Sequence, residues 1–122
     1  MAAGVLIVDD LAFVKAALKD IVEKAGFAVV GMASDGVEAL QLFEERQPEV
    51  VLLDITMPRM DGIEALRRMR KLNPKARIIM CSALGQQRMI MTAIGLGARD
   101  FIVKPFRPER VVGSIKKALN IE

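Results

Sequence analysis

Residues 50–54 read Val-Val-Leu-Leu-Asp, a short apolar run that ends at a carboxylate. Three further apolar runs in the chain are also followed directly by polar residues. The other runs, each with the polar residues that follow it, are 5–8 with Asp9 and Asp10, 78–81 with Ser82, and 101–103 with Lys104. Short apolar runs of this kind are typical of buried parallel strands. If the four runs lie in one sheet, their polar residues meet at one edge, where open α/β sheets bind ligands.

The segments between the runs have the periodicity of helices, and Gly, Pro or Asn residues mark where those helices end. The sequence predicts helices at about 11–25, 36–46, 62–72, 86–96 and 108–119, and a further strand at 28–33. The positions expected to face inward are Leu11, Val14, Leu18, Ile21 and Val22 in the first helix, and Val37, Leu40 and Phe43 in the second. Strict alternation with short loops predicts an α/β fold, a parallel sheet with helices on both faces.

Length and composition favour one domain over residues 1–122 with its own core, since 52% of the chain is hydrophobic. No stretch approaches the roughly eighteen apolar residues of a membrane span. The first ten residues have no basic region and end in two acids, unlike a signal peptide. The single cysteine, Cys81, lies in an apolar run and is expected to be a buried, inert thiol. We therefore expect a cytoplasmic protein without membrane insertion.

The net charge of +3 is unevenly placed, because residues 86–122 hold seven basic and three acidic residues. A nucleic acid could bind such a segment. However, the chain has no Trp, no Tyr and no recognised DNA-binding motif. We expect a protein partner for this end of the chain, and no nucleic acid.

The absence of histidine removes several kinds of chemistry. The chain cannot carry phosphohistidine, use an imidazole base or build a histidine-containing metal site. A Ser-His-Asp or Cys-His nucleophile is excluded for the same reason. The glycine-rich nucleotide cradles GxGxxG and GxxxxGKS or GxxxxGKT are also absent.

Four motifs, in order, give the chain a close resemblance to response-regulator receiver domains. They are the acid pair Asp9-Asp10, the stretch 54–62 (Asp-Ile-Thr-Met-Pro-Arg-Met-Asp-Gly), Ser82-Ala83 and Lys104-Pro105-Phe106. Within this family, residues 81–87 (Cys-Ser-Ala-Leu-Gly-Gln-Gln) are most similar to single-domain chemotaxis regulators of the CheY type. The resemblance covers the whole chain and implies a flavodoxin-like, doubly wound (βα)5 sheet with strand order 2-1-3-4-5. It also implies a cis peptide bond between Lys104 and Pro105.

The acidic residues suit Mg²⁺, which prefers oxygen ligands and is usually held by one or two carboxylates, waters and phosphate oxygens. We expect Asp10 and Asp54 to ligate the ion directly and Asp9 to hold a ligating water. The resemblance adds the backbone carbonyl of Thr56. An alternative explanation, that one acid caps the following helix, accounts for one carboxylate but not for two.

Asp54 is the candidate nucleophile, since a carboxylate can accept a phosphoryl group when a metal screens the repulsion between anions. Lys104 is expected to neutralise one phosphoryl oxygen, and Ser82 to donate a hydrogen bond to another. The structural alternatives are a surface lysine and a strand-end serine. Phe101 stands where many receivers have tyrosine, so it is either a switching ring without a hydroxyl or simple core packing.

The resemblance implies a phospho-accepting switch of a two-component system, expected to serve chemotaxis. A histidine kinase would supply the phosphoryl group, and the helix at 86–96, the strand at 101–103 and the helix at 108–119 would bind the target. That target is expected to be a flagellar-motor switch protein or another protein, with a phosphatase as a further partner. The chain would be a monomer and no enzyme, apart from catalysing its own phosphotransfer and slow autodephosphorylation.

Three alternatives remain open from the sequence. The chain could be the receiver domain of a larger regulator with a DNA-binding or other output domain. A second alternative is an aspartyl-phosphate phosphatase of the haloacid dehalogenase type, but that motif has a second Asp where Thr56 stands. A third is an FMN-binding flavodoxin, in which the acids at 9 and 10 would repel a bound phosphate.

Overall fold

Five parallel strands form one sheet at the centre of the protein. The computed structural model describes residues 2–83 and 85–121. The strands are β1 (Gly4–Val8), β2 (Ala28–Ala33), β3 (Val50–Asp54), β4 (Ile78–Ser82) and β5 (Asp100–Val103). Their order is β2-β1-β3-β4-β5. The predicted flavodoxin-like topology is therefore confirmed.

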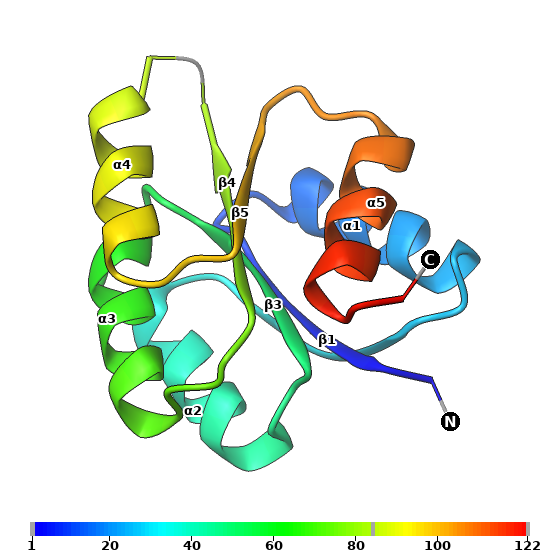
Figure 1. Cartoon of the computed structure of the whole chain (residues 1–122), viewed down its shortest axis with the longest axis horizontal. Helices are drawn as coiled ribbons and strands as arrows, with labels where there is room; N and C mark the ends of the chain where they lie inside the picture. Colours follow the sequence, from blue (N-terminus) through cyan, green and yellow to red (C-terminus); the bar gives the residue numbers. More distant parts are fainter. Residues whose placement is uncertain (1, 84, 122) are drawn as a thin grey trace.

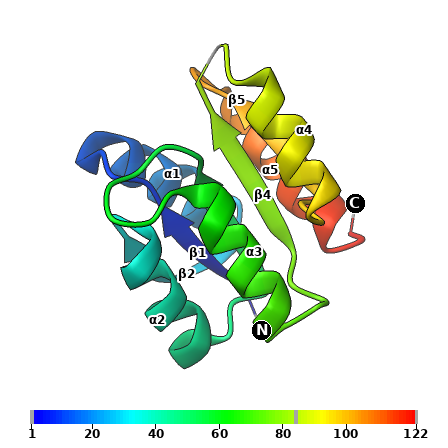
Figure 2. The ribbon, with the colours of Figure 1, turned by 90° about the vertical axis from the view of Figure 1, so that its left-hand side faces the viewer.

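Helices cover both faces of this sheet. They are α1 (Ala12–Lys24), α2 (Gly36–Arg46), α3 (Gly62–Leu72), α4 (Gln87–Gly95) and α5 (Pro108–Ala118). Figure 1 shows α1 and α5 on one side of the sheet and α2, α3 and α4 on the other, and Figure 2 shows the second side from the front. In the described part of the chain, no helix is both long and apolar enough to cross a membrane.

The side chains of each strand alternate between two cores. Val5 and Ile7 of β1 join the cluster under α1 and α5, whereas Leu6 and Val8 join the cluster under α2, α3 and α4. All five residues of β1, of β3 and of β4 are buried. Burial on both faces explains why these strands appear in the sequence as continuous apolar runs.

Two residues expected to face inward are instead exposed, Leu11 at 43% and Val37 at 36%. Leu11 precedes α1 as its N-cap residue, outside the buried stripe of the helix. In α2, the side chain of Asp35 accepts a hydrogen bond from the Glu38 backbone and so fixes where the helix begins. The buried residues of α2 are Gly36, Ala39 and Phe43. Val37 directly follows Gly36, so its side chain points to a different side of the helix.

The strand register brings the carboxyl ends of four strands to one edge. Val8 of β1 lies opposite Leu53 of β3, and Asp54 lies opposite Cys81 of β4. Ser82 lies opposite Val103 of β5. The residues that end these strands, and those immediately after them, are therefore neighbours in space.

Candidate functional site

Three carboxylates gather at this edge, as the sequence predicted. Asp9, Asp10 and Asp54 each place one ligand oxygen so that all three lie within 4.8 Å of one another. Asp9 and Asp54 are buried, whereas Asp10 is exposed to solvent. The N-cap residue of α1 is Leu11, so neither acid of the pair caps that helix. The helix-cap explanation for the acid pair is not supported.

The negative charges of Asp9 and Asp10 repel that of Asp54. Burial, followed by the charge of Asp9 and to a smaller degree that of Asp10, raises the pKa of Asp54 to about 6. The charge of Lys104 and its hydrogen bond oppose this increase. A cation placed between the carboxylates would favour their charged forms and relieve the repulsion.

Lys104 reaches into the cluster from the end of β5. Its Nζ donates to Asp9 Oδ2 at 2.7 Å and to Asp54 Oδ1 at 3.3 Å. Burial alone would lower the pKa of Lys104, but the hydrogen bond to Asp9 and the charges of Asp54 and Asp9 outweigh it and raise that pKa. The peptide bond between Lys104 and Pro105 is cis, as the family resemblance implied. Lys104 is thus an ion-paired site residue rather than a freely solvated surface lysine.

Ser82 carries an unused hydroxyl at the same edge. The residue is fully buried, and its Oγ has no hydrogen-bond partner among residues 2–83 and 85–121. Buried polar groups are hydrogen-bonded in the great majority of cases, so an unpaired hydroxyl needs an explanation. A ligand oxygen at this edge would supply the missing partner.

The loop between β3 and α3, which contains Thr56, is held by two contacts. Gly62 approaches the end of β3 so closely that a Cβ there would lie 1.9 Å from the Asp54 carbonyl oxygen. Arg59 has a left-handed backbone with φ of 65° and donates to Asp35 at 2.6 and 2.9 Å. The hydrogen bond from the Glu38 backbone, with the Arg59 guanidinium, lowers the pKa of Asp35 despite its burial. The loop between β3 and α3 is therefore anchored to the start of α2 as well as to β3.

Gln86 is a site residue that the sequence did not single out. Its Oε1 accepts from the Ala83 backbone N–H at 2.7 Å, and its Nε2 donates to Thr56 Oγ1 at 2.8 Å. The carboxamide therefore joins the loop after β4 to the loop after β3. The contact to Thr56 spans 30 positions along the chain. No local sequence pattern indicates a contact of this range.

Phe101 is half-buried and lies between the core and a surface groove. It packs against the cluster under α2, α3 and α4. On its other side is an apolar groove, lined by Ile90, Met91 and Ile94 of α4 and by Phe101 and Val103 of β5. Both sequence interpretations of Phe101, core packing and a ring that can move, are compatible with this position.

The site suits a hard divalent cation. Its ligand atoms are carboxylate oxygens, gathered on neighbouring strands and partly open to solvent through Asp10. Oxygen-only donors with room for water are the usual surroundings of Mg²⁺, whereas softer metals select thiolate or imidazole. The one thiol nearby, Cys81, is buried, and burial raises its pKa to about 12. The residues present therefore fit Mg²⁺.

The protein belongs to the response-regulator receiver domains: residues 5–116 match the family described as the response regulator receiver domain. The chain is similar to the chemotaxis protein CheY of Thermotoga maritima, at 53% identity over 96% of this chain and 98% of that protein. The chemotaxis protein CheY of Bacillus subtilis is 52% identical over 98% of this chain and 100% of that protein.

A solved structure agrees in fold as well as in sequence. CheY in the CheX-CheY-BeF3-Mg²⁺ complex from Borrelia burgdorferi is 37% identical, with a TM-score of 0.92 over 96% of this chain and 89% of that chain. The expected family, fold and likeness to single-domain chemotaxis regulators are confirmed. The phosphatase and flavodoxin alternatives find no support in these relatives.

Proposed function

We propose that the protein is a switch of a chemotaxis-type two-component system, in which Asp54 takes a phosphoryl group from a histidine kinase. One observation carries the proposal. In a receiver domain, Asp54 lies within a cluster of three carboxylates and in contact with the ammonium of Lys104. An acidic nucleophile, oxygen ligands for a cation and a fixed positive charge are the parts that phosphoryl transfer to a carboxylate needs.

The transfer uses one carboxylate oxygen of Asp54. This oxygen attacks the phosphorus of phosphohistidine while the phosphorus–nitrogen bond breaks. The bonding electrons go to the imidazole nitrogen, and the product is an acyl phosphate on Asp54. Lys104 Nζ neutralises one phosphoryl oxygen and the Ser82 hydroxyl donates to another, so both stabilise charge that develops during transfer.

The residues that would hold Mg²⁺ are Asp10 and Asp54 directly, Asp9 through a water, and the Thr56 backbone carbonyl. When bound, the ion screens the repulsion between the carboxylates and the incoming phosphoryl oxygens. Asp9 also accepts from Lys104 at 2.7 Å, so it orients the lysine as well as serving the metal. The solved relative that contains BeF3 and Mg²⁺ supports Mg²⁺ as the ion.

Phosphorylation is expected to act on a target through α4, β5 and α5. Ser82 ends β4 and Lys104 follows β5, so hydrogen bonds from both to a phosphoryl group would pull on this side of the fold. The apolar groove beside Phe101 and the basic excess of residues 86–122 suit a partner with apolar anchors and acidic flanks. A flagellar-motor switch protein or another protein target fits this description, and a phosphatase would be a further partner.

The protein would be a phosphoacceptor that catalyses its own phosphotransfer and slow dephosphorylation, not an enzyme that acts on a separate substrate. The same chemistry would serve a receiver domain within a larger regulator.

The proposal is tested by incubating the protein with acetyl phosphate and Mg²⁺ and locating the added phosphate by intact-mass and peptide mass spectrometry. We expect a single phosphate on Asp54, none in Asp54→Asn, and none when a chelator removes the metal. Asp20→Asn, which removes an exposed carboxylate on α1, is the matched control and should be labelled like the original chain. Undiminished labelling of Asp54→Asn would contradict the assignment.

A further inference from the structure

Gln86, at the start of α4, uses its carboxamide to join two loops rather than to cap the backbone of its own helix. Asp35 and Asp61 are the N-cap residues of α2 and α3, and each accepts a hydrogen bond from a backbone N–H of its own helix. Gln86 is the N-cap residue of α4, and it makes no such bond within the described part of the chain. Its carboxamide is turned back to Ala83 and across to Thr56. Its one contact with α4 itself is a long one, from Nε2 to Met89 Sδ at 4.0 Å, so stabilisation of its own helix does not explain the two shorter bonds.

Two contacts of the carboxamide, those to Thr56 and Ala83, lie on either side of the proposed phosphoryl position. Thr56 is two residues beyond the acceptor Asp54, and Ala83 directly follows Ser82. Among the described residues, the buried Ser82 hydroxyl has no partner, whereas the adjacent Ala83 N–H is taken by Gln86. A serine hydroxyl and the next backbone N–H are separated by few covalent bonds. An anion held by the Ser82 hydroxyl therefore comes close to the Ala83 N–H.

We propose that Gln86 is a positioning residue that holds the unphosphorylated state, because its carboxamide occupies the Ala83 N–H and the Thr56 hydroxyl until a phosphoryl group competes for that N–H. The inference rests on the proposed function and adds a restraint to it. A contact made only in one of two states shifts the equilibrium toward that state. Gln86 thus weakens phosphoryl binding, and it couples that binding to the position of the first turn of α4.

Beryllofluoride with Mg²⁺, a phosphoryl mimic that binds without covalent chemistry, measures this restraint by calorimetry. Gln86→Ala should bind it about fivefold more tightly, equivalent to about 1 kcal/mol, since one net hydrogen bond contributes about that much. Gln87→Ala removes a neighbouring, exposed glutamine from the same helical turn and should bind like the original chain. The Mg²⁺ affinity of Gln86→Ala without beryllofluoride should also be unchanged.

A double-mutant cycle separates a shared restraint from a general loosening of the loop. Thr56→Val keeps the shape of the side chain but removes the hydroxyl that accepts from Gln86. If the two residues act through one contact, the gains of Gln86→Ala and Thr56→Val are not additive. In NMR spectra of the original chain, beryllofluoride should also shift the side-chain amide protons of Gln86 more than those of Gln87.

The outcomes are distinguishable. If the original chain does not bind beryllofluoride, the proposed function fails and this inference fails with it. If it binds, but Gln86→Ala binds equally or more weakly, only the role of Gln86 is overturned. Additive gains, or Gln86 amide protons that do not respond, would also overturn that role.

Discussion

The two strand–helix units that flank the proposed phosphoryl position, β3–α3 and β4–α4, are built very differently. In α3, Gly62, Ala65, Leu66 and Met69 are buried and Asp61 caps the first turn. In α4, one of nine residues, Ala93, is buried, and the N-cap side chain makes no capping bond within the described chain. Figure 2 shows the two helices beside each other on the same face of the sheet. Packing rather than location therefore distinguishes them.

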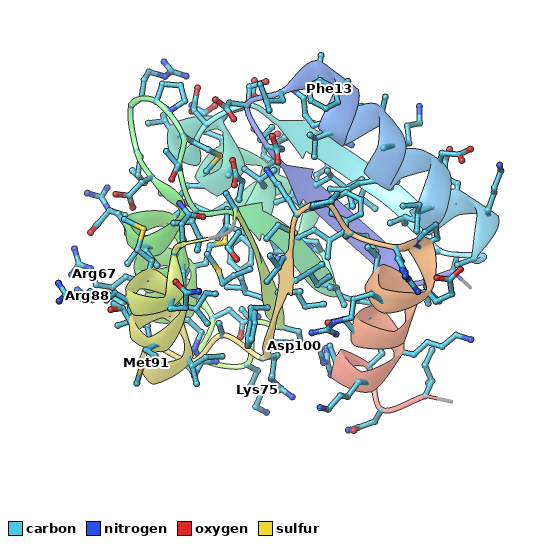
Figure 3. All side chains as sticks on the ribbon, turned by 90° about the horizontal axis from the view of Figure 1, so that it is seen from above. Phe13, Arg67, Lys75, Arg88, Met91 and Asp100 are labelled. Carbon is cyan, nitrogen blue, oxygen red and sulfur yellow. The ribbon has the colours of Figure 1, made fainter. Side chains whose placement is uncertain are left out.

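The site therefore has a fixed half, the β3–α3 unit, and a responsive half, the β4–α4 unit. The β3–α3 unit holds the acceptor Asp54, and its loop is anchored to α2 through Arg59 and Asp35. The β4–α4 unit holds the unpartnered Ser82 and the exposed Met91, which points away from the molecule (Figure 3). Elements with few buried contacts rearrange at the lowest free-energy cost. A signal received at Asp54 is therefore expected to be expressed through α4.

The largest expected effect comes from truncating one apolar side chain in each helix. Leu66 is fully buried in α3, whereas Met91 in α4 is 76% exposed. Leu66→Ala should lower the free energy of unfolding by about 2–5 kcal/mol, since it leaves a cavity. Met91→Ala should change it by less than about 0.5 kcal/mol. Urea unfolding of both variants measures the contrast, and equal losses would show that α4 is as firmly packed as α3.

A glycine in each helix gives the next largest contrast. A Cβ at Gly62 would meet the Asp54 carbonyl at 1.9 Å, whereas a Cβ at Gly95 would have no described atom within 4 Å apart from its chain neighbours and the backbone of its own helix. Gly62→Ala should cost roughly 1–3 kcal/mol through overpacking. Gly95→Ala should stabilise the protein by about 0.5–1 kcal/mol, because alanine favours a helix over glycine. Thermal unfolding tests both, and a tolerated Gly62→Ala would argue against the close contact.

The pH dependence of stability should reveal the stored repulsion at Asp54. Its pKa is raised from 3.8 to about 6, so between these pH values the folded state binds more protons than the unfolded state. Stability is therefore lost as pH rises through this window and stays lower above it. In chelator, Asp54→Asn should avoid this loss and be more stable by about 1–2 kcal/mol at pH 7, less than the full pKa difference implies because solvent screens part of the repulsion.

Chemical unfolding at pH 4 and pH 7 separates this effect from a general stabilisation. The advantage of Asp54→Asn should be small at pH 4 and full at pH 7. An advantage of equal size at both pH values would mean that Asp54 is not under electrostatic strain.

The smallest effect on stability is expected at Ser82, in the responsive half. Because its buried hydroxyl has no partner in the part of the chain that the structure describes, Ser82→Ala should leave the unphosphorylated protein equally stable or more stable, by no more than about 1 kcal/mol. The same variant should bind beryllofluoride about tenfold more weakly, since it lacks the donor to the ligand. A marked loss of stability without ligand would show that the hydroxyl already has a structural role.

The sequence predicted the sheet and the acidic cluster because both depend on local patterns. Apolar runs such as 50–53 mark buried strands, and parallel strands bring the residues after them to one edge. The approach of Lys104 to Asp54 also follows from this rule. For Asp9, the sequence predicted a role in holding a metal-bound water. Its hydrogen bond from Lys104 was not predicted, because it depends on side-chain geometry that residue spacing does not indicate.

Features that depend on distant contacts were not predicted. The bridge from Gln86 to Thr56 joins two loops, and nothing around either residue indicates its partner. In α2, Phe43 is buried and Leu40 packs against the core as expected, whereas Val37 is exposed and Gly36 and Ala39 take the inward positions. In α4, the apolar residues Met89, Met91 and Ile94 are exposed, which depends on how the helix packs against its neighbours.

The single thiol of the chain, that of Cys81, lies one residue before Ser82 in β4. Cys81 is buried in β4, and burial raises its pKa to about 12, so almost no thiolate forms at neutral pH. The thiolate is the species that oxidants and alkylating reagents attack. Cys81 is therefore expected to react slowly with such reagents. A cysteine introduced at the position of Met91 would accept a spectroscopic label without interference from the native thiol, and would report directly on α4.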